Sequence, residues 1–126
     1  GAWSSESRVT LIGISNARFN LAEAWRHLDS EGITTNVFVL NFLMPFVANK
    51  HWWHLLAEVE RTGKVVIAHC SYGPCSIAEH IGFELAKLTG AKVRIVGMEY
   101  ILSGVAPGLD NSTPSVERIV RAVKEL

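Results

Sequence analysis

Short apolar segments and longer amphipathic segments alternate along almost the whole sequence. The short segments are rich in β-branched residues and cover residues 9–14, 34–40, 64–68 and 92–96, as is typical of buried β-strands. The longer segments have apolar residues at helical spacing. Strands that alternate with helices are joined by right-handed crossovers and lie parallel. The pattern therefore predicts an α/β fold, a three-layer α/β/α sandwich with a mostly parallel sheet.

The amphipathic segments also carry the start and stop signals of α-helices. Their apolar faces contain Leu21, Trp25 and Leu28; Trp52, Leu56 and Val59; Ile77, Ile81, Leu85 and Leu88; and Val116, Ile119, Val120 and Val123. The residues that predict helix starts are Ser15 or Asn16, Asn49, and Thr113 followed by Pro114. The residues that predict helix ends are Gly32, Gly63 and Gly90.

Composition limits the classes of protein to which the chain can belong. Its 126 residues suffice for one domain, which we expect to cover residues 8–126 after a tail or remnant at residues 1–7. Twelve basic and twelve acidic side chains give no net charge and form no basic stripe, so nucleic acid is not expected as a partner. The apolar runs are too short to span a membrane. Two cysteines cannot build a disulfide framework, which favours a cytoplasmic location.

Three segments follow predicted strands, at residues 15–18, 41–46 and 69–76, and could meet a ligand there. None of them is a glycine-rich phosphate-binding or dinucleotide-binding loop. The ligand candidates in these segments are Ser15, Asn16, Arg18, Ser71, Tyr72 and Gly73. Helix starts after these strands could also hold an anion weakly.

Cys70, directly after His69, suggests a different class of protein, a small cysteine enzyme of the rhodanese or phosphatase type. Those enzymes present a thiolate between a strand and a helix N-terminus. The arginine that would clamp the anion is missing, because the matching positions are Cys75 and Ser76. We therefore predict no catalytic residue. If the chain is a cysteine enzyme, the candidate catalytic residues are Cys70 and His69.

A zinc site is a second alternative for the same segment. His69, Cys70, Cys75 and His80 are four zinc-type ligands close together in the sequence. Adjacent residues rarely point to one ion, and the spacing is not that of a zinc knuckle. We therefore expect no metal, with these four residues as the weak alternative.

Trp52 and Trp53, with Phe46 nearby, indicate a contact surface. Neighbouring residues on a helix point about 100° apart, so both indoles cannot face the same core. We expect one indole to pack inside. The other is an interface candidate, because tryptophan is enriched in protein interfaces.

Several stretches, taken in order, resemble the C-terminal domain of the transketolase-like thiamine-diphosphate enzymes. They lie at residues 9–15, 22–28 with 30–33, 37–45, 61–67, and 106–109 with 114–120, and include Arg-Thr-Gly-Lys-Val-Val-Ile at 61–67 and Pro-Ser-Val-Glu-Arg-Ile-Val at 114–120. The likeness covers residues 8–126. It is closest to the β subunit of the decarboxylating component of pyruvate and branched-chain 2-oxo acid dehydrogenases. Ala68-His69 stands where that family usually has a Glu-Glu pair.

The resemblance implies a supporting role in an enzyme that acts on 2-oxo acids or ketoses. Thiamine diphosphate and Mg²⁺ would be held by partner domains, the pyrimidine-binding and diphosphate-binding ones, and not by this domain. The domain would support dimerisation and subunit docking, in a homodimer or a hetero-oligomer. The corresponding domain of a 2-oxo acid:ferredoxin oxidoreductase is an alternative, and its tail matches residues 106–126 less well.

Overall fold

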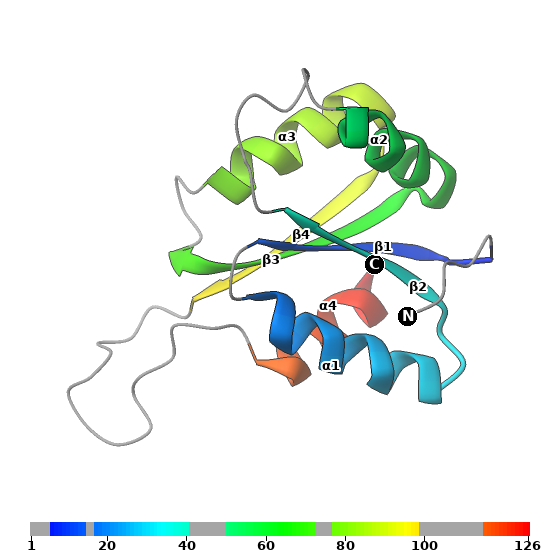
Figure 1. Cartoon of the computed structure of the whole chain (residues 1–126), viewed down its shortest axis with the longest axis vertical. Helices are drawn as coiled ribbons and strands as arrows, with labels where there is room; N and C mark the ends of the chain where they lie inside the picture. Colours follow the sequence, from blue (N-terminus) through cyan, green and yellow to red (C-terminus); the bar gives the residue numbers. More distant parts are fainter. Residues whose placement is uncertain (1–5, 15–16, 41–49, 73–76, 99–114) are drawn as a thin grey trace.

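All four strands of the described chain run parallel, and the connections between them contain helices (Figure 1). The computed structural model describes residues 6–14, 17–40, 50–72, 77–98 and 115–126. In chain order the elements are β1 (Val9–Ile14), α1 (Ala17–Ser30), β2 (Thr35–Leu40), α2 (Lys50–Thr62), β3 (Lys64–Tyr72), α3 (Ile77–Thr89), β4 (Lys92–Met98) and α4 (Val116–Glu125). The strand order in the sheet is β2-β1-β3-β4. The predicted α/β fold is confirmed.

Different helices cover the two faces of the sheet (Figure 1). Leu11 of β1 and Val66 of β3 pack in one core with α1 and α4. The next residue on each strand, Ile12 and Ile67, packs in the other core with α2 and α3. Successive side chains of a strand point to opposite faces, so strands buried on both faces are apolar almost throughout. This packing confirms the three-layer sandwich.

The first three helices end where the glycines predicted. After α2, Gly63 has a φ of 70°, a left-handed conformation that glycine adopts without strain. Its N–H donates to the carbonyl oxygen of Val59 at 2.8 Å, which closes the helix. Among the described residues, no helix is long and apolar enough to cross a membrane.

The third strand is longer than the sequence pattern predicted. We expected it to stop at Ala68 and a loop to begin at His69, but β3 continues to Tyr72. Tyr72 pairs with Met98 of β4 after a register shift that begins at Ala68. The prediction was wrong because the strand is extended by the pairing of Tyr72 with Met98 of β4, a contact between residues remote in sequence. Cys70 therefore belongs to a strand, and not to a loop between strand and helix.

The start of the last helix also differs from the prediction. Ser115, and not Thr113, caps α4: its Oγ accepts a hydrogen bond from the backbone N–H of Arg118 at 3.2 Å. The predicted first-turn Pro114 lies outside the described residues, before the cap. The other predicted caps, Ser15, Asn16 and Asn49, also lie outside them. The predicted apolar face of α4 is confirmed, with Ile119 and Val123 buried.

A buried polar cluster joins the chain before β1 to β2 and α2. Glu58 of α2 has a side chain that is 4% exposed, and its Oε1 accepts hydrogen bonds from Ser7 Oγ at 2.6 Å and Asn36 Nδ2 at 3.0 Å. Arg61 donates to both carboxylate oxygens, at 2.6 and 3.1 Å. Ser7 was assigned to the expected tail, yet it is buried here. The packed structure thus includes Ser7, one residue before the predicted boundary.

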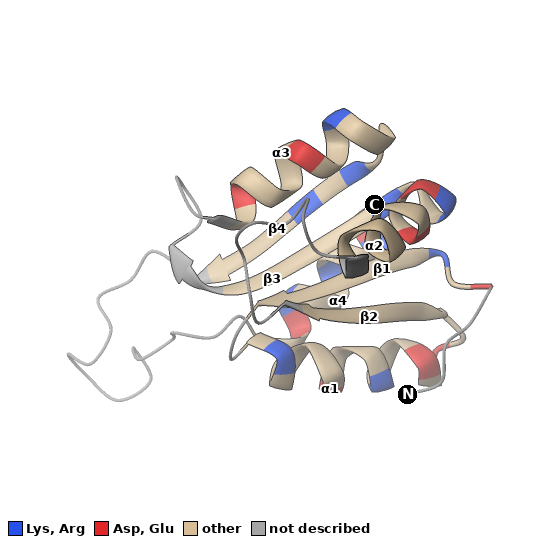
Figure 2. Cartoon of the chain, turned by 45° about the horizontal axis from the view of Figure 1, so that its top comes forward, with Lys and Arg blue, Asp and Glu red and all other residues tan. Residues whose placement is uncertain are grey.

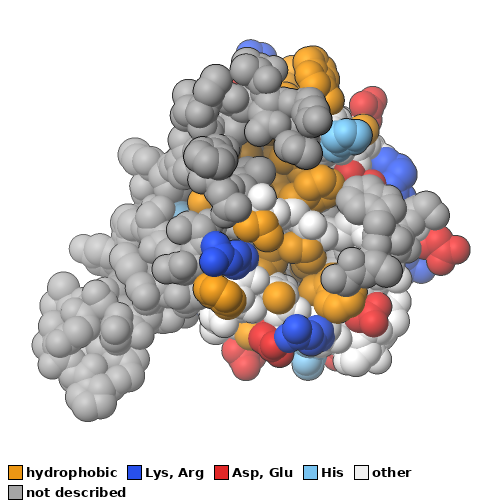
Figure 3. Space-filling view, viewed as in Figure 1, with side chains coloured by type: hydrophobic (Ala, Val, Ile, Leu, Met, Phe, Trp, Pro, Cys, Tyr) orange, Lys and Arg blue, Asp and Glu red, His pale blue; other side chains and the backbone are white. Residues whose placement is uncertain are grey.

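The two edge strands differ in charge. β4 carries Lys92 and Arg94, both exposed (Figure 2), which is how proteins commonly protect an open edge. β2 carries no charged residue, and its Val39 is 43% exposed. On the face seen in Figure 3, hydrophobic side chains gather between the two helix layers, where β2 lies. The β2 edge is therefore the more apolar of the two.

Candidate functional site at the carboxyl edge of the sheet

The strand order places a topological switch point between β1 and β3. From β1 the chain crosses through α1 to β2 on one side, and from β3 it crosses through α3 to β4 on the other. Open parallel sheets bind ligands at the carboxyl ends of the strands at such a point. In this chain that position lies beyond Ile14 and Tyr72, and we take it as the candidate site.

Several residues of the predicted ligand, interface and metal sets lie outside the described residues. These residues are Ser15, Asn16, Phe46, Gly73 and Cys75, together with the side chains of Cys70, Ser71 and Tyr72. Arg18 is described, in the first turn of α1. Its exposed guanidinium lies 4.7 Å from the centre of the Phe19 ring, as in a cation–π contact. The structure thus places Arg18 at the site's edge and leaves the others as predictions.

His69 is the most deeply buried ionisable side chain that the structure describes at this edge. It lies in β3 and is 1% exposed. Burial lowers the pKa of His69 below its ordinary value of 6.5. Glu79, in the first turn of α3, acts in the opposite direction, and Arg118 of α4 lowers the pKa further. His69 is therefore neutral at physiological pH.

Arg118 connects the last helix to the end of the edge strand. Its Nη1 donates to the carbonyl oxygen of Gly97 in β4 at 2.6 Å. The guanidinium is thereby held near the carboxyl edge of the sheet, where its charge acts on His69. His69 thus lies in the opposing fields of one carboxylate and one guanidinium.

These opposing charges predict two variants with opposite effects on one pKa. Arg118→Gln removes a positive charge and should raise the pKa of His69, whereas Glu79→Gln removes a negative charge and should lower it. The measurement is the titration of the His69 imidazole by NMR in the parent and both variants. Shifts in the same direction would contradict the assigned geometry.

The same imidazole makes stability depend on pH. In the unfolded chain this histidine takes up a proton near its ordinary pKa of 6.5, whereas in the folded chain its lowered pKa resists protonation. The contribution of His69 to stability is therefore fully present above that pH and falls as the pH is lowered through it.

A buried neutral imidazole can exchange a proton only with a group that reaches it. His69 alone does not make this edge an active site.

The described residues do not include all four ligands of the alternative zinc site. His69 is buried in β3, and His80 is exposed on α3. Within the described ranges, no three His, Cys, Asp or Glu side chains form a group that could hold a metal ion. Cys75 and the thiol of Cys70 lie outside those ranges, so this alternative stays a prediction.

The structure separates the two neighbouring indoles of α2. Trp52 is 5% exposed and packs in the core under α2 and α3, whereas Trp53 is 64% exposed. Trp53 is therefore the member of the predicted interface set whose ring is available to a partner. Phe46, the third member, lies outside the described residues.

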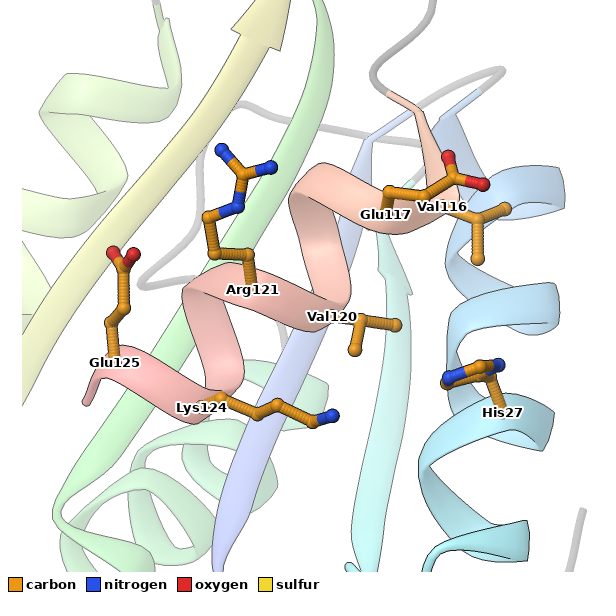
Figure 4. A pocket seen from close by; sticks show the side chains of 7 residues that line it. All are labelled: His27, Val116, Glu117, Val120, Arg121, Lys124 and Glu125. Atoms are coloured by element: carbon orange, nitrogen blue, oxygen red, sulfur yellow. The ribbon is translucent and has the colours of Figure 1, made fainter.

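A groove of about 310 Å³ lies between α1 and α4 (Figure 4). It is lined by His27, Val116, Glu117, Val120, Arg121, Lys124 and Glu125. Lys124 points toward α1 in this view, and its Nζ lies 2.8 Å from Oε2 of Glu31 just beyond the end of that helix. The described residues of the lining are apolar and charged side chains, as in a contact surface.

Two groups of residues were missed by sequence reasoning. One is the Ser7–Asn36–Glu58–Arg61 cluster, for which the only signal is Glu58 at a core-facing position of α2 with Arg61 one turn later. The other consists of Arg94 of β4 with Arg118 and Arg121 of α4. Arg94 is far from the other two in the sequence. Neither group forms a motif that spacing could reveal.

No family model matches the sequence, and no curated protein matches it significantly. Solved structures do match. Over 95% of its length the chain superposes on 39% of a chain of a split-gene transketolase, an inactive β4 tetramer, with a TM-score of 0.69 and 22% identity. The chain has the fold of the C-terminal domain of transketolase-like enzymes.

Two further structures agree on that fold. Transketolase from Campylobacter jejuni matches 98% of this chain with 17% of its own length, a TM-score of 0.62 and 20% identity. The 2-oxoglutarate:ferredoxin oxidoreductase from Magnetococcus marinus, solved with 2-oxoglutarate, coenzyme A and succinyl-CoA bound, matches 99% with 18% of its length, a TM-score of 0.60 and 18% identity. This chain thus spans less than half of each of these three chains.

Proposed function

We propose that the chain acts as the accessory C-terminal domain of a thiamine-diphosphate-dependent enzyme, of transketolase or pyruvate dehydrogenase β-subunit type, that acts on 2-oxo acids or ketoses. One observation carries the proposal: nearly the whole chain matches one part of much longer enzyme chains. A domain that corresponds to one part of a longer enzyme is expected to contribute to assembly of that enzyme, by dimerisation and subunit docking.

The proposal assigns thiamine diphosphate and Mg²⁺ to partner domains. Mg²⁺ prefers carboxylate and phosphate oxygens as ligands. In the described ranges, the candidate site offers His69 beside one carboxylate and one guanidinium, and no metal-binding group is formed. The described residues offer no set of oxygen ligands for Mg²⁺, and the proposal therefore places the cofactor on the pyrimidine-binding and diphosphate-binding partner domains.

Two surface features support contact with a partner. Trp53 exposes most of its indole on α2, and exposed tryptophan is typical of interface anchors. The β2 edge is uncharged and apolar (Figure 3), whereas unprotected apolar edges are rare in free domains. Both features are expected of a domain that packs against other parts of an enzyme.

Replacing Trp53 with lysine should abolish this association. A lysine ammonium cannot enter a desolvated contact without losing its hydration, and loss of one tryptophan anchor costs at least about 2 kcal/mol of binding free energy. Sedimentation velocity of the chain and of Trp53→Lys over a range of concentrations measures the effect. We expect the parent to associate and the variant to remain monomeric with an unchanged melting temperature.

Phe19→Lys is the matched control. Phe19 is 61% exposed, almost as much as Trp53, but it lies on α1 in the opposite helix layer. The control should associate like the parent. If parent and Trp53→Lys were both monomeric at every concentration, the assembly role would lose its support.

A second candidate is the corresponding domain of a 2-oxo acid:ferredoxin oxidoreductase. It is favoured by the match that covers 99% of this chain in such an enzyme. The two candidates differ in the electron acceptor of the complete enzyme. Reduction of ferredoxin, an iron–sulfur protein, by the complete enzyme with a 2-oxo acid would select the second candidate.

A further inference from the structure

A polar hollow of about 150 Å³ lies between the edge strand β4 and the last helix. Arg94 reaches it from β4, and Arg118 and Arg121 reach it from consecutive turns of α4, with Glu125 one turn further on. Figure 4 shows that Arg121 is directed away from α1, unlike Lys124. Three guanidinium groups from two elements thus converge on one small volume.

The charges in this hollow are not balanced. Glu125 Oε2 lies 3.1 Å from Arg94 Nη1, and it is the only carboxylate among the described residues that line the hollow. These described groups, three guanidiniums and one carboxylate, leave a local excess of two positive charges. The whole chain carries no net charge. The excess therefore distinguishes this hollow from the average surface.

One of the arginines is already held in place, because Arg118 donates to the carbonyl of Gly97. Arg94 contacts Glu125, but both side chains are about half exposed, so this ion pair is weak and an anion can replace it. Arg121 is exposed and forms no ion pair with any residue that the structure describes. Holding Arg118 in advance reduces the conformational entropy that is lost when a ligand binds. Arg94 and Arg121 supply the remaining donors.

Edge protection explains only part of this arrangement. A basic residue on an open strand, such as Arg94, discourages pairing with another chain. That role does not require Arg118 and Arg121 to approach the same volume, since like charges on neighbouring helix turns repel each other. An anion would relieve this repulsion.

We propose that the hollow formed by Arg94, Arg118 and Arg121 binds a phosphoryl group. A guanidinium presents two parallel N–H donors that match two phosphate oxygens. A phosphate dianion also matches the local excess of two positive charges. The hollow shares Arg118 with the candidate site at the carboxyl edge of the sheet. It lies on α4, on the opposite face of the sheet from α2 and Trp53, so it can be tested independently of the proposed assembly role.

The test is an NMR titration of the ¹⁵N-labelled 126-residue chain with two probes, inorganic phosphate and glycerol 3-phosphate, at constant ionic strength. We expect saturable shifts of the arginine Nε–H signals and of the α4 amides. Arg121→Gln should weaken binding about tenfold or more, as loss of a charged hydrogen bond does. Since Arg121 is exposed and has no ion pair among the described residues, this variant should fold normally.

Two further variants make the result specific. Glu125→Gln removes the competing carboxylate and should strengthen binding severalfold. Arg8→Gln removes an exposed positive charge before β1 and should leave binding unchanged. Equal affinity for both probes would assign the site to the free anion, and tighter binding of glycerol 3-phosphate would assign it to a phosphate ester. Shifts that do not saturate, or an equal loss in Arg8→Gln, would overturn the proposal.

Discussion

Glu58→Ala should lower the free energy of unfolding by about 3 kcal/mol, the low end of the range for breaking a buried ion pair. The carboxylate of Glu58 accepts hydrogen bonds from Ser7, Asn36 and Arg61. Without it, the Ser7 hydroxyl and the Asn36 amide remain buried with fewer acceptors. Arg61 is 39% exposed and regains hydration, which limits the loss. Urea denaturation followed by fluorescence measures the change.

The neighbouring Glu60→Ala is the control for this prediction. Glu60 lies on the same helix and is exposed, so its removal should change the unfolding free energy by no more than about 0.5 kcal/mol.

The Glu58 cluster should also make stability depend on pH. Burial raises the pKa of Glu58, but hydrogen bonds from Arg61, Ser7 and Asn36 outweigh it, and the pKa is lowered below 4.5. Its contribution is therefore present above that pH and is lost as the pH falls through the lowered value. Equal unfolding free energies of Glu58→Ala and Glu60→Ala would show that the buried cluster contributes nothing to stability.

Gly13→Ala should destabilise the fold by about 2 to 3 kcal/mol, because it overpacks a rigid contact. A Cβ at Gly13 in β1 would lie 2.8 Å from Leu21 Cδ2 and 3.2 Å from the Arg18 Cα. The leucine tip can rotate, but the backbone of α1 can move only if the helix shifts on the sheet. We expect a lower melting temperature, measured by circular dichroism.

Gly82→Ala separates backbone contact from side-chain contact. A Cβ at Gly82 in α3 would meet only side-chain atoms, the nearest being Val93 Cγ1 at 2.9 Å. Alanine also favours a helix over glycine by about 1 kcal/mol, which offsets part of the strain. Gly82→Ala should thus cost clearly less than Gly13→Ala. The reverse order would mean that α1 does not approach β1 as closely as the structure shows.

The elements that sequence predicted best are those set by local physics. Val9–Ile14 was predicted with its exact bounds, because a β-branched apolar run between polar residues has few alternatives. The helix ends before Gly32, Gly63 and Gly90 were predicted because those glycines adopt positive φ angles. The end of β3 was missed, because residues 69–72 extend the strand only by pairing with β4.

The candidate site, too, was predicted only in part from the sequence. The pattern of strands and helices predicted which loops follow the strands, and it marked His69, Arg18 and the Trp52–Trp53 pair. It could not tell that His69 is buried between fields from Glu79 and Arg118, since these residues come from three separate elements. It left open which indole faces out, although Trp52 shares the apolar face of the predicted helix with Leu56 and Val59. The packing of α2 on the sheet decided that Trp53 is the exposed one.

The amino-acid sequence alone determined the alternation of strands and helices, the glycine helix ends and the apolar faces, since these depend on backbone preferences and on the periods of hydrophobic residues. Only the tertiary structure decided the strand order, the burial of Glu58 with Ser7 and Asn36, and the convergence of Arg94 with Arg118 and Arg121. The physical reason is distance along the chain. Contacts between residues remote in sequence form only when the packed sheet and helices bring them together.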